Sequence, residues 1–148
     1  MLPNKEILTD KICVSSDFGE LTHIRDFVIH KALEFGFLED EAFRISLAVD
    51  EACSNLIRHA FKMDASQRIC VLIQTDSNEF IVDIQDMGFP FNPLDVAPPE
   101  MMEYFKQFKK GGLGIHIMRS VMDEISYQPS QDKAVPNTLR LKKYKSAS

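Results

Sequence analysis

Apolar and polar positions follow a two-residue period in some parts of the chain and a helical period in others. In the segment 79–86 (EFIVDIQD), alternation places Phe80, Val82 and Ile84 on one face of a strand. The segment 68–75 (RICVLIQT) is predicted to be its neighbour, joined through a turn at Ser77-Asn78. Residues 6–14 are expected to form a first strand, and the segments 124–128 and 138–144 a closing hairpin.

Helical spacing predicts three longer helices. The first follows Asp17, an N-cap with Glu20 as its capping-box partner, and ends at Gly36. The second runs from about Glu39 to Phe61, and the third from the glycines at 111–114 to about residue 123. The apolar stripes of the first two helices are Leu21, Ile24, Phe27, Val28 and Leu33, and then Phe43, Leu47, Ala48, Leu56 and Ala60.

The order of these elements predicts the fold class. Helices that alternate with antiparallel strands indicate a two-layer α+β sandwich, with a mixed, mostly antiparallel sheet covered on one face by helices. A length of 148 residues with 45% hydrophobic content fits a single domain over residues 1–148.

Composition narrows the classes of function. A formal net charge of −5 argues against direct nucleic-acid binding, which needs a basic surface. The N-terminus lacks the apolar core of a secretory signal, and no apolar stretch is long enough to span a membrane, so we expect a cytoplasmic protein. Cys13, Cys53 and Cys70 have no CxxC spacing and are expected to be reduced thiols.

Glu51 and Asn55 form the first candidate site. They lie four residues apart on the second helix and therefore share a face, with small alanines beside them. An amide and a carboxylate on one face suit Mg²⁺, which prefers hard oxygen ligands and retains water. The alternative is an ordinary solvated helix face.

Asp86 is the second candidate. Alternation carries it onto the same face as Ile84, where a carboxylate needs a partner, and the amine of an adenine ring is a suitable donor. Gly88 permits a close approach to the backbone. The alternative is that the strand ends at Gln85 and that Asp86 begins a turn.

The glycines of Gly111-Gly112-Leu113-Gly114 form the third candidate, at the start of a helix. Backbone N–H groups there can bind phosphate, and Lys109 and Lys110 add positive charge. The alternative is a flexible joint. The preceding segment 89–110, with four prolines and a short helix expected after Pro99, suggests a lid over a ligand, although it can also lack a function.

These three motifs, taken in order, resemble the boxes of the GHKL superfamily of histidine kinases and gyrase-type ATPases (the Bergerat fold). The motifs are E-A-C-S-N-L-I-R-H-A-F at 51–61, D-M-G-F-P-F-N-P at 86–93 and G-G-L-G-I at 111–115. Within the superfamily the chain resembles the bacterial anti-sigma factor serine/threonine kinases over essentially its whole length.

The resemblance implies roles for individual residues. Glu51 corresponds to the catalytic glutamate, the general base, and Asn55 to the Mg²⁺-binding asparagine. Asp86 corresponds to the aspartate that binds the adenine amine, and Gly88 to the glycine of its motif. The backbone from Gly112 through Leu113 to Gly114 would contact phosphates, with Lys110 near the γ-phosphate.

One departure concerns the last strand. Thr138 falls near a threonine that supports adenine binding in the family, but the chain has Pro136-Asn137-Thr138 where relatives usually have Gly-Thr-Thr. Lys110 stands where some relatives place an arginine, and a lysine supplies charge without the bidentate fork.

The resemblance also implies an activity and partners. A protein of this type binds Mg²⁺ and ATP, phosphorylates an anti-sigma factor antagonist with a STAS-type domain, sequesters a sigma factor, and forms a homodimer. A non-catalytic ATP-binding module for partner switching would retain the same nucleotide residues, and Glu51 favours the enzyme. A gyrase-type switch would need further domains, and a histidine kinase a phosphoacceptor helix pair.

Overall fold

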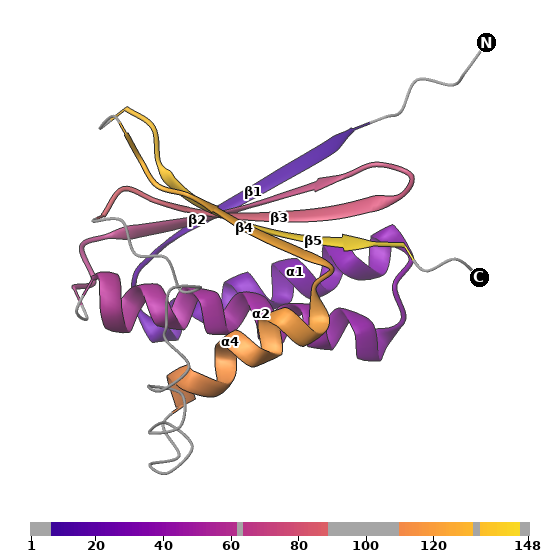
Figure 1. The fold of residues 1–148 in the computed structure, drawn as a ribbon, viewed down its shortest axis with the longest axis horizontal. Coiled ribbons are helices and arrows are strands. Elements are labelled where there is room, and N and C mark those ends of the chain that lie inside the picture. The colour runs from indigo at the N-terminus through magenta and orange to yellow at the C-terminus, as the bar shows by residue number, and fades with distance from the viewer. Residues whose placement is uncertain (1–6, 62–63, 89–109, 132–133, 146–148) are drawn as a thin grey trace.

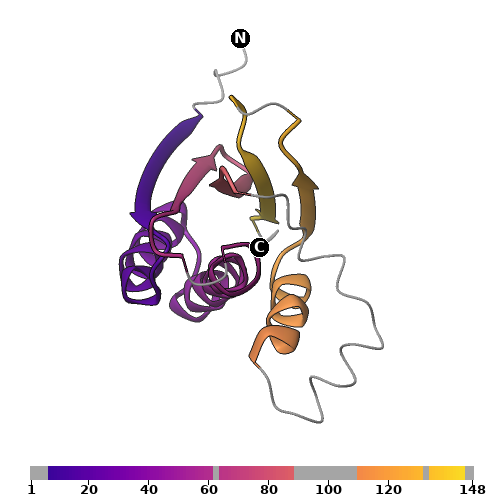
Figure 2. The same ribbon diagram turned by 90° about the vertical axis from the view of Figure 1, so that its left-hand side faces the viewer.

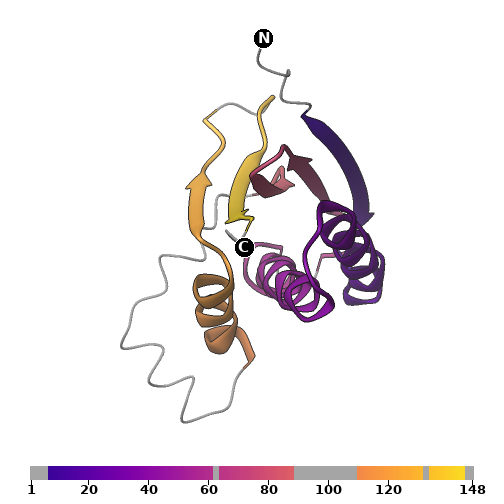
Figure 3. The same cartoon turned by 90° about the vertical axis from the view of Figure 1, so that its right-hand side faces the viewer.

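The computed structural model describes residues 7–61, 64–88, 110–131 and 134–145. These residues form a five-stranded sheet with α-helices packed on one of its faces (Figure 1). The strands are β1 (Leu8–Ser15), β2 (Arg68–Thr75), β3 (Glu79–Asp86), β4 (Glu124–Gln128) and β5 (Asn137–Tyr144). The helices are α1 (Leu21–Phe35), α2 (Glu39–Asn55) and α4 (Lys110–Val121). Figure 2 and Figure 3 show the two layers from either side, with α1, α2 and α4 side by side below the sheet.

The strand order is β1-β2-β3-β5-β4, and each neighbouring pair of these described strands is antiparallel. The predicted two-layer α+β class is confirmed, while the sheet is antiparallel throughout instead of mixed. One reason is that β5 lies between β3 and β4, which run in the same direction and each pair antiparallel with β5. The other is the pair of helices between β1 and β2. Two consecutive helices return the chain to the end of the sheet where β1 finishes, so β2 runs back against β1.

Local signals fixed several element ends as predicted. Gly36 ends α1 in the left-handed conformation, with φ of 116°. The Asp17 side chain accepts a hydrogen bond from the Gly19 N–H at 2.9 Å, but it caps a short 3₁₀ turn, Phe18–Glu20, and α1 begins only after that turn. The bounds predicted for β2 and β3 are those observed. A π-helical turn, Leu56–Ala60, prolongs α2.

The core lies between the sheet and the helices. Two residues of the predicted apolar stripes are exposed and do not belong to it. Leu33 and Phe43 are 42% and 56% exposed, while their neighbours Ala32, Ala42 and Ile45 are fully buried. Helical spacing defines a stripe, but the elements packed against a helix decide which edge of that stripe is covered. Here α2 lies between α1 and α4, which turns its small residues inward.

Helix α4 begins at Lys110, one residue before the glycines, and ends at Val121. The short helix expected after Pro99 and nearly all of the predicted lid lie outside the described residues. Among the helices that the structure describes, none is long and apolar enough to cross a bilayer.

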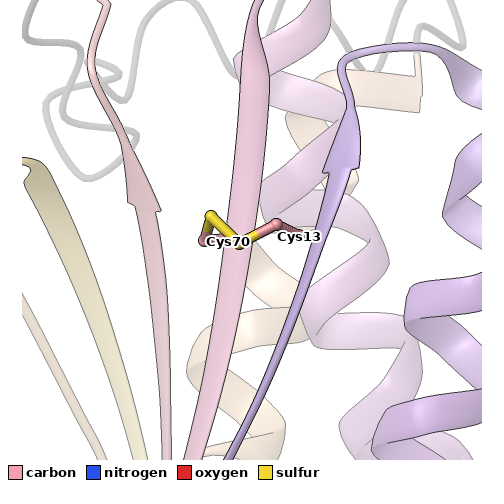
Figure 4. Close-up of a disulfide and its surroundings, with 2 residues drawn as sticks. All are labelled: Cys13 and Cys70. Carbon is pink, nitrogen blue, oxygen red and sulfur yellow. A yellow bond between two sulfur atoms is a disulfide. The ribbon is translucent and has the colours of Figure 1, made fainter.

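Two of the three cysteines form a disulfide, which corrects the expectation of reduced thiols. The β1–β2 register places Cys13 directly opposite Cys70, with their Cα atoms 4.1 Å apart and their sulfurs bonded (Figure 4). Strand alternation turns this pair away from the helices, since the adjacent Val14 and Ile69 are buried. Cys53 is a buried free thiol on α2.

Candidate functional site

A small pocket lies at one end of the sheet, between α2 and the strands β3, β4 and β5. The C-terminal end of α2, the end of β3 and the start of α4 all lie at this end of the molecule (Figure 1). The pocket is lined by Ala52, Asn55, Leu56, Ile84, Asp86, Tyr127 and Leu139. Two of the three predicted motifs therefore contribute a side chain to a single pocket.

Asn55 enters the pocket from the last turn of α2. The residue is only 3% exposed, and its Oδ1 atom has no hydrogen-bond partner among the described residues. A buried carbonyl oxygen without a donor is costly and suits a cation or a water bound to one. No three His, Cys, Asp or Glu side chains of the described residues gather as a metal site. A single amide ligand fits Mg²⁺, which retains waters and phosphate oxygens as its other ligands.

Glu51 lies one turn before Asn55 on α2, as the spacing predicts. Its side chain is half-buried, and it is not among the residues that line the pocket. The structure therefore brings Glu51 to the neighbourhood of Asn55 but not to the pocket wall. Its assignment as general base stays a prediction.

Asp86 closes the pocket from the end of β3. Its side chain is only 4% exposed and lies on the same face as Ile84, as alternation predicts. Oδ1 accepts hydrogen bonds from the Gly88 N–H at 2.9 Å and from Asn137 Nδ2 at 3.1 Å. Burial raises the pKa of this carboxyl above its ordinary value, while the hydrogen bonds from Asn137 and Gly88 oppose that rise. An ionised carboxylate held in this way is an acceptor for a donor inside the pocket.

The residue of β5 that meets Asp86 is Asn137, not Thr138. Asn137 is the register partner of Asp86, whereas Thr138 pairs with Gln85 on the opposite face of the sheet. The structure thus does not bring Thr138 to the pocket. Sequence reasoning shifted the assignment by one residue, and a one-residue shift along a strand reverses the face.

A glycine is needed at position 88 because a side chain of the protein itself packs against the backbone there. A Cβ built on Gly88 would lie 2.6 Å from Cε1 of Phe61, whose ring is buried. The Gly88 carbonyl accepts a hydrogen bond from Asn137 Nδ2 at 2.9 Å. The sequence signal for close backbone approach was therefore informative, but the group that approaches is the phenylalanine that ends the first motif.

The third motif forms the first turns of α4. Gly111, Gly112 and Gly114 follow Lys110 within the helix, and among the described residues the N–H groups of its first turn have no helical acceptor. Such a terminus carries partial positive charge and attracts anions. Helix α4 packs against α2, the helix that carries Asn55.

Tyr127 and Leu139 are pocket residues that sequence reasoning missed. They are register partners on β4 and β5 and form the wall opposite α2. The alternation of the closing hairpin was a signal for their shared face, but nothing in the sequence indicated that this face reaches the pocket. The pocket is narrow, with a volume of about 10 Å³, roughly that of one water molecule. A planar base can enter only if these walls separate.

Comparison with known proteins agrees with this geometry. Residues 14–143 match the model of the histidine kinase-like ATPase domain. The serine-protein kinase RsbW of Bacillus subtilis is 30% identical over 101 residues, which are 66% of this chain and 63% of that protein. RsbW of Bacillus pumilus is 30% identical over 113 residues, 72% of this chain and 70% of that protein.

The family match includes every residue that lines the pocket, and the relatives share the kinase name. The chain therefore belongs to the family of histidine kinase-like ATPase domains, with RsbW serine-protein kinases among its relatives.

Proposed function

We propose that the protein is an ATP-dependent serine/threonine kinase of the anti-sigma factor type. It binds ATP with Mg²⁺, transfers the γ-phosphoryl group to an anti-sigma factor antagonist that carries a STAS-type domain, and sequesters a sigma factor. It acts in the cytoplasm as a homodimer, without direct contact with nucleic acid or membrane. The names of the RsbW relatives support the kinase activity.

The observation that carries the proposal is the pairing of two buried polar groups in one pocket. Asn55 presents a carbonyl oxygen that no donor of the described residues reaches, and Asp86 presents a carboxylate held by two donors. Burying either group without a ligand costs stability, because each has lost its hydration. A nucleotide with its metal satisfies both, since it offers an amine at one end and a cation at the other.

Each motif has a separate task in the proposed reaction. Asp86 accepts the amine of adenine and sets the position of the base. Asn55 holds Mg²⁺, which when bound neutralises phosphate charge. The N–H groups in the first turn of α4, from Lys110 to Gly112, hold phosphate oxygens, and Lys110 adds positive charge near the γ-phosphate. Glu51 accepts the proton of the incoming serine or threonine hydroxyl.

A second candidate is an ATP-binding regulatory module that transfers nothing. One observation favours it, namely that Glu51 does not line the pocket. If transfer did occur, the carboxylate of Glu51 would have to reach the acceptor hydroxyl from outside the pocket, together with the partner protein.

Labelled ATP separates the two candidates. The purified chain is incubated with γ-labelled ATP, Mg²⁺ and a panel of STAS-type domains, and transfer to a serine or threonine is followed by phosphopeptide mapping. Transfer by the wild type and none by Asp86→Asn supports the kinase. ATP binding by calorimetry without transfer to any acceptor supports the module, and absence of both binding and transfer refutes both candidates.

A further inference from the structure

The strand β1 is held to the sheet by contacts other than its disulfide. It lies at the edge of the described sheet, and all of its residues pair in register with β2. Val14 is buried in the core, and just beyond the strand the Ser16 N–H donates a hydrogen bond to the Gln67 carbonyl at 2.9 Å. We therefore expect β1 to stay in the sheet when the bond between Cys13 and Cys70 is broken.

The disulfide lies where a small molecule in solution can reach it. Cys13 and Cys70 are both partly exposed, and they lie on the sheet face that no helix of the described residues covers (Figure 2 and Figure 4). Cys53 is the contrast, because it is fully buried on α2. In thiol–disulfide exchange the attacking thiolate must approach a sulfur atom, so access separates reactive cysteines from inert ones.

Two exposed basic residues flank the pair. Lys11 lies two positions before Cys13 on β1, and Arg68 lies two positions before Cys70 on β2. A step of two residues along a strand returns to the same face, so both positive charges share the face of the disulfide. Gln85, the register partner of Cys70 on β3, is neutral. This setting attracts small anionic sulfur compounds, of which glutathione is an example.

Strand register keeps the two sulfurs together even in the reduced form. The β1–β2 pairing places Cys13 opposite Cys70 with their Cα atoms 4.1 Å apart, although 57 positions separate them in sequence. A thiol held beside its partner attacks at a high effective concentration. The pairing therefore favours closure of the internal bond over a lasting bond to an external thiol.

We propose that Cys13 and Cys70 are a redox-active pair that exchanges with low-molecular-weight thiols and disulfides while the protein stays folded, and that oxidation of the pair locks β1 to β2. In a reducing compartment the pair is a dithiol until an oxidant appears. Neither cysteine lines the nucleotide pocket, so the pair works whether or not the proposed kinase activity is correct.

Oxidation proceeds in two exchange steps with a low-molecular-weight disulfide as the oxidant. In the first, one cysteine thiolate attacks a sulfur of that disulfide, which forms a mixed disulfide and releases one small thiolate. In the second, the other cysteine thiolate attacks the protein sulfur of the mixed disulfide, which forms the Cys13–Cys70 bond and releases a second small thiolate. The two cysteines lose two electrons and two protons, and the oxidant gains them as two small thiols. Reduction is the reverse.

The first test measures exchange in the folded full-length chain. The protein is incubated at several ratios of reduced to oxidised glutathione, quenched with acid and alkylated in denaturant, and mass spectrometry counts the thiols at each cysteine. We expect Cys13 and Cys70 to open and close together and reversibly, at least about 100-fold faster than glutathione modifies Cys53, which must first be exposed by opening of the core. Equal rates, or exchange that requires urea, would overturn the inference.

Single variants isolate the mixed disulfide. Cys13→Ser and Cys70→Ser each retain one thiol of the pair and should each bind one glutathione lastingly, whereas the wild type should not accumulate this product. Cys53→Ala is the matched control and should leave exchange at the pair unchanged. Should a serine variant not fold, alanine replaces serine. Folded single variants that take up no glutathione would overturn the proposed access.

Backbone hydrogen exchange tests the lock. Reduction should lower the protection of the β1 amides at least about tenfold, and the double variant Cys13→Ser with Cys70→Ser should match the reduced wild type whatever the glutathione ratio. Equal protection of β1 in the oxidised and reduced forms would overturn the lock. Loss of cooperative urea unfolding on reduction would show that the fold itself needs the bond, and would overturn exchange in the folded state.

Discussion

Gly88→Ala tests how the first and second motifs are packed together. A Cβ on Gly88 would lie 2.6 Å from Cε1 and 3.1 Å from Cδ1 of Phe61. A favourable carbon–carbon contact is about 3.5 Å or more, so the ring must move by about 0.9 Å. Gly88 does not have the positive φ found at Gly36, so the backbone accepts alanine and the clash alone determines the cost.

The expected loss of stability follows from the burial of the ring. Phe61 is 5% exposed, so its ring can move only by displacing other core side chains. Forcing one extra methyl group into a packed core costs about 1–3 kcal/mol. Urea denaturation of Gly88→Ala should show a loss in this range in the free energy of unfolding.

Gly19→Ala is the matched control, because the nearest atom to its Cβ would be Asp17 Oδ1 at an ordinary 3.5 Å. It should change stability by less than about 0.5 kcal/mol. Adding Phe61→Leu to Gly88→Ala should recover part of the loss, so that the double variant is more stable than the sum of the single changes indicates. Wild-type stability in Gly88→Ala, or strict additivity in the double variant, would refute the proposed contact.

Four further results are expected. Glu51→Gln should keep ATP affinity and lose phosphoryl transfer, and transfer at the wild-type rate would exclude Glu51 as the base. Asn55→Ala should weaken ATP binding at least about tenfold in Mg²⁺ but little in EDTA, and calorimetry that shows equal affinity in Mg²⁺ would exclude the metal role. Because burial raises the pKa of Asp86, ATP affinity should increase as the pH rises through that raised pKa and should then level off. The proton bound to Asp86 stabilises the folded state below the pKa of the unfolded chain, and this stabilisation should be lost over the same rise in pH. Asp86→Asn should lack both effects. Without reductant, a thiol reagent should label Cys53 alone, because Cys13 and Cys70 form a disulfide. It should do so only after unfolding, since burial shields the Cys53 thiol and raises its pKa. Labelling of all three cysteines would show that the disulfide is absent in solution.

The sequence by itself determined the elements whose signals are local. Alternation in the segments 68–75 and 79–86 gave β2 and β3 with their observed bounds and put Asp86 on the buried face. A glycine at position 36 ended α1, since it adopts a φ that other residues avoid. The spacing of Glu51 and Asn55 placed both on one helix, one turn apart.

Only the tertiary structure decided which of these elements meet. The β3–β5 register places Asn137, and not Thr138, opposite Asp86. The β1–β2 register brings together Cys13 and Cys70, which are 57 residues apart in sequence. The packing of α2 between two other helices left Phe43 exposed. Periodicity within a segment depends on the backbone of that segment alone, whereas register and coverage depend on the relative placement of two segments, a quantity that neither segment encodes by itself.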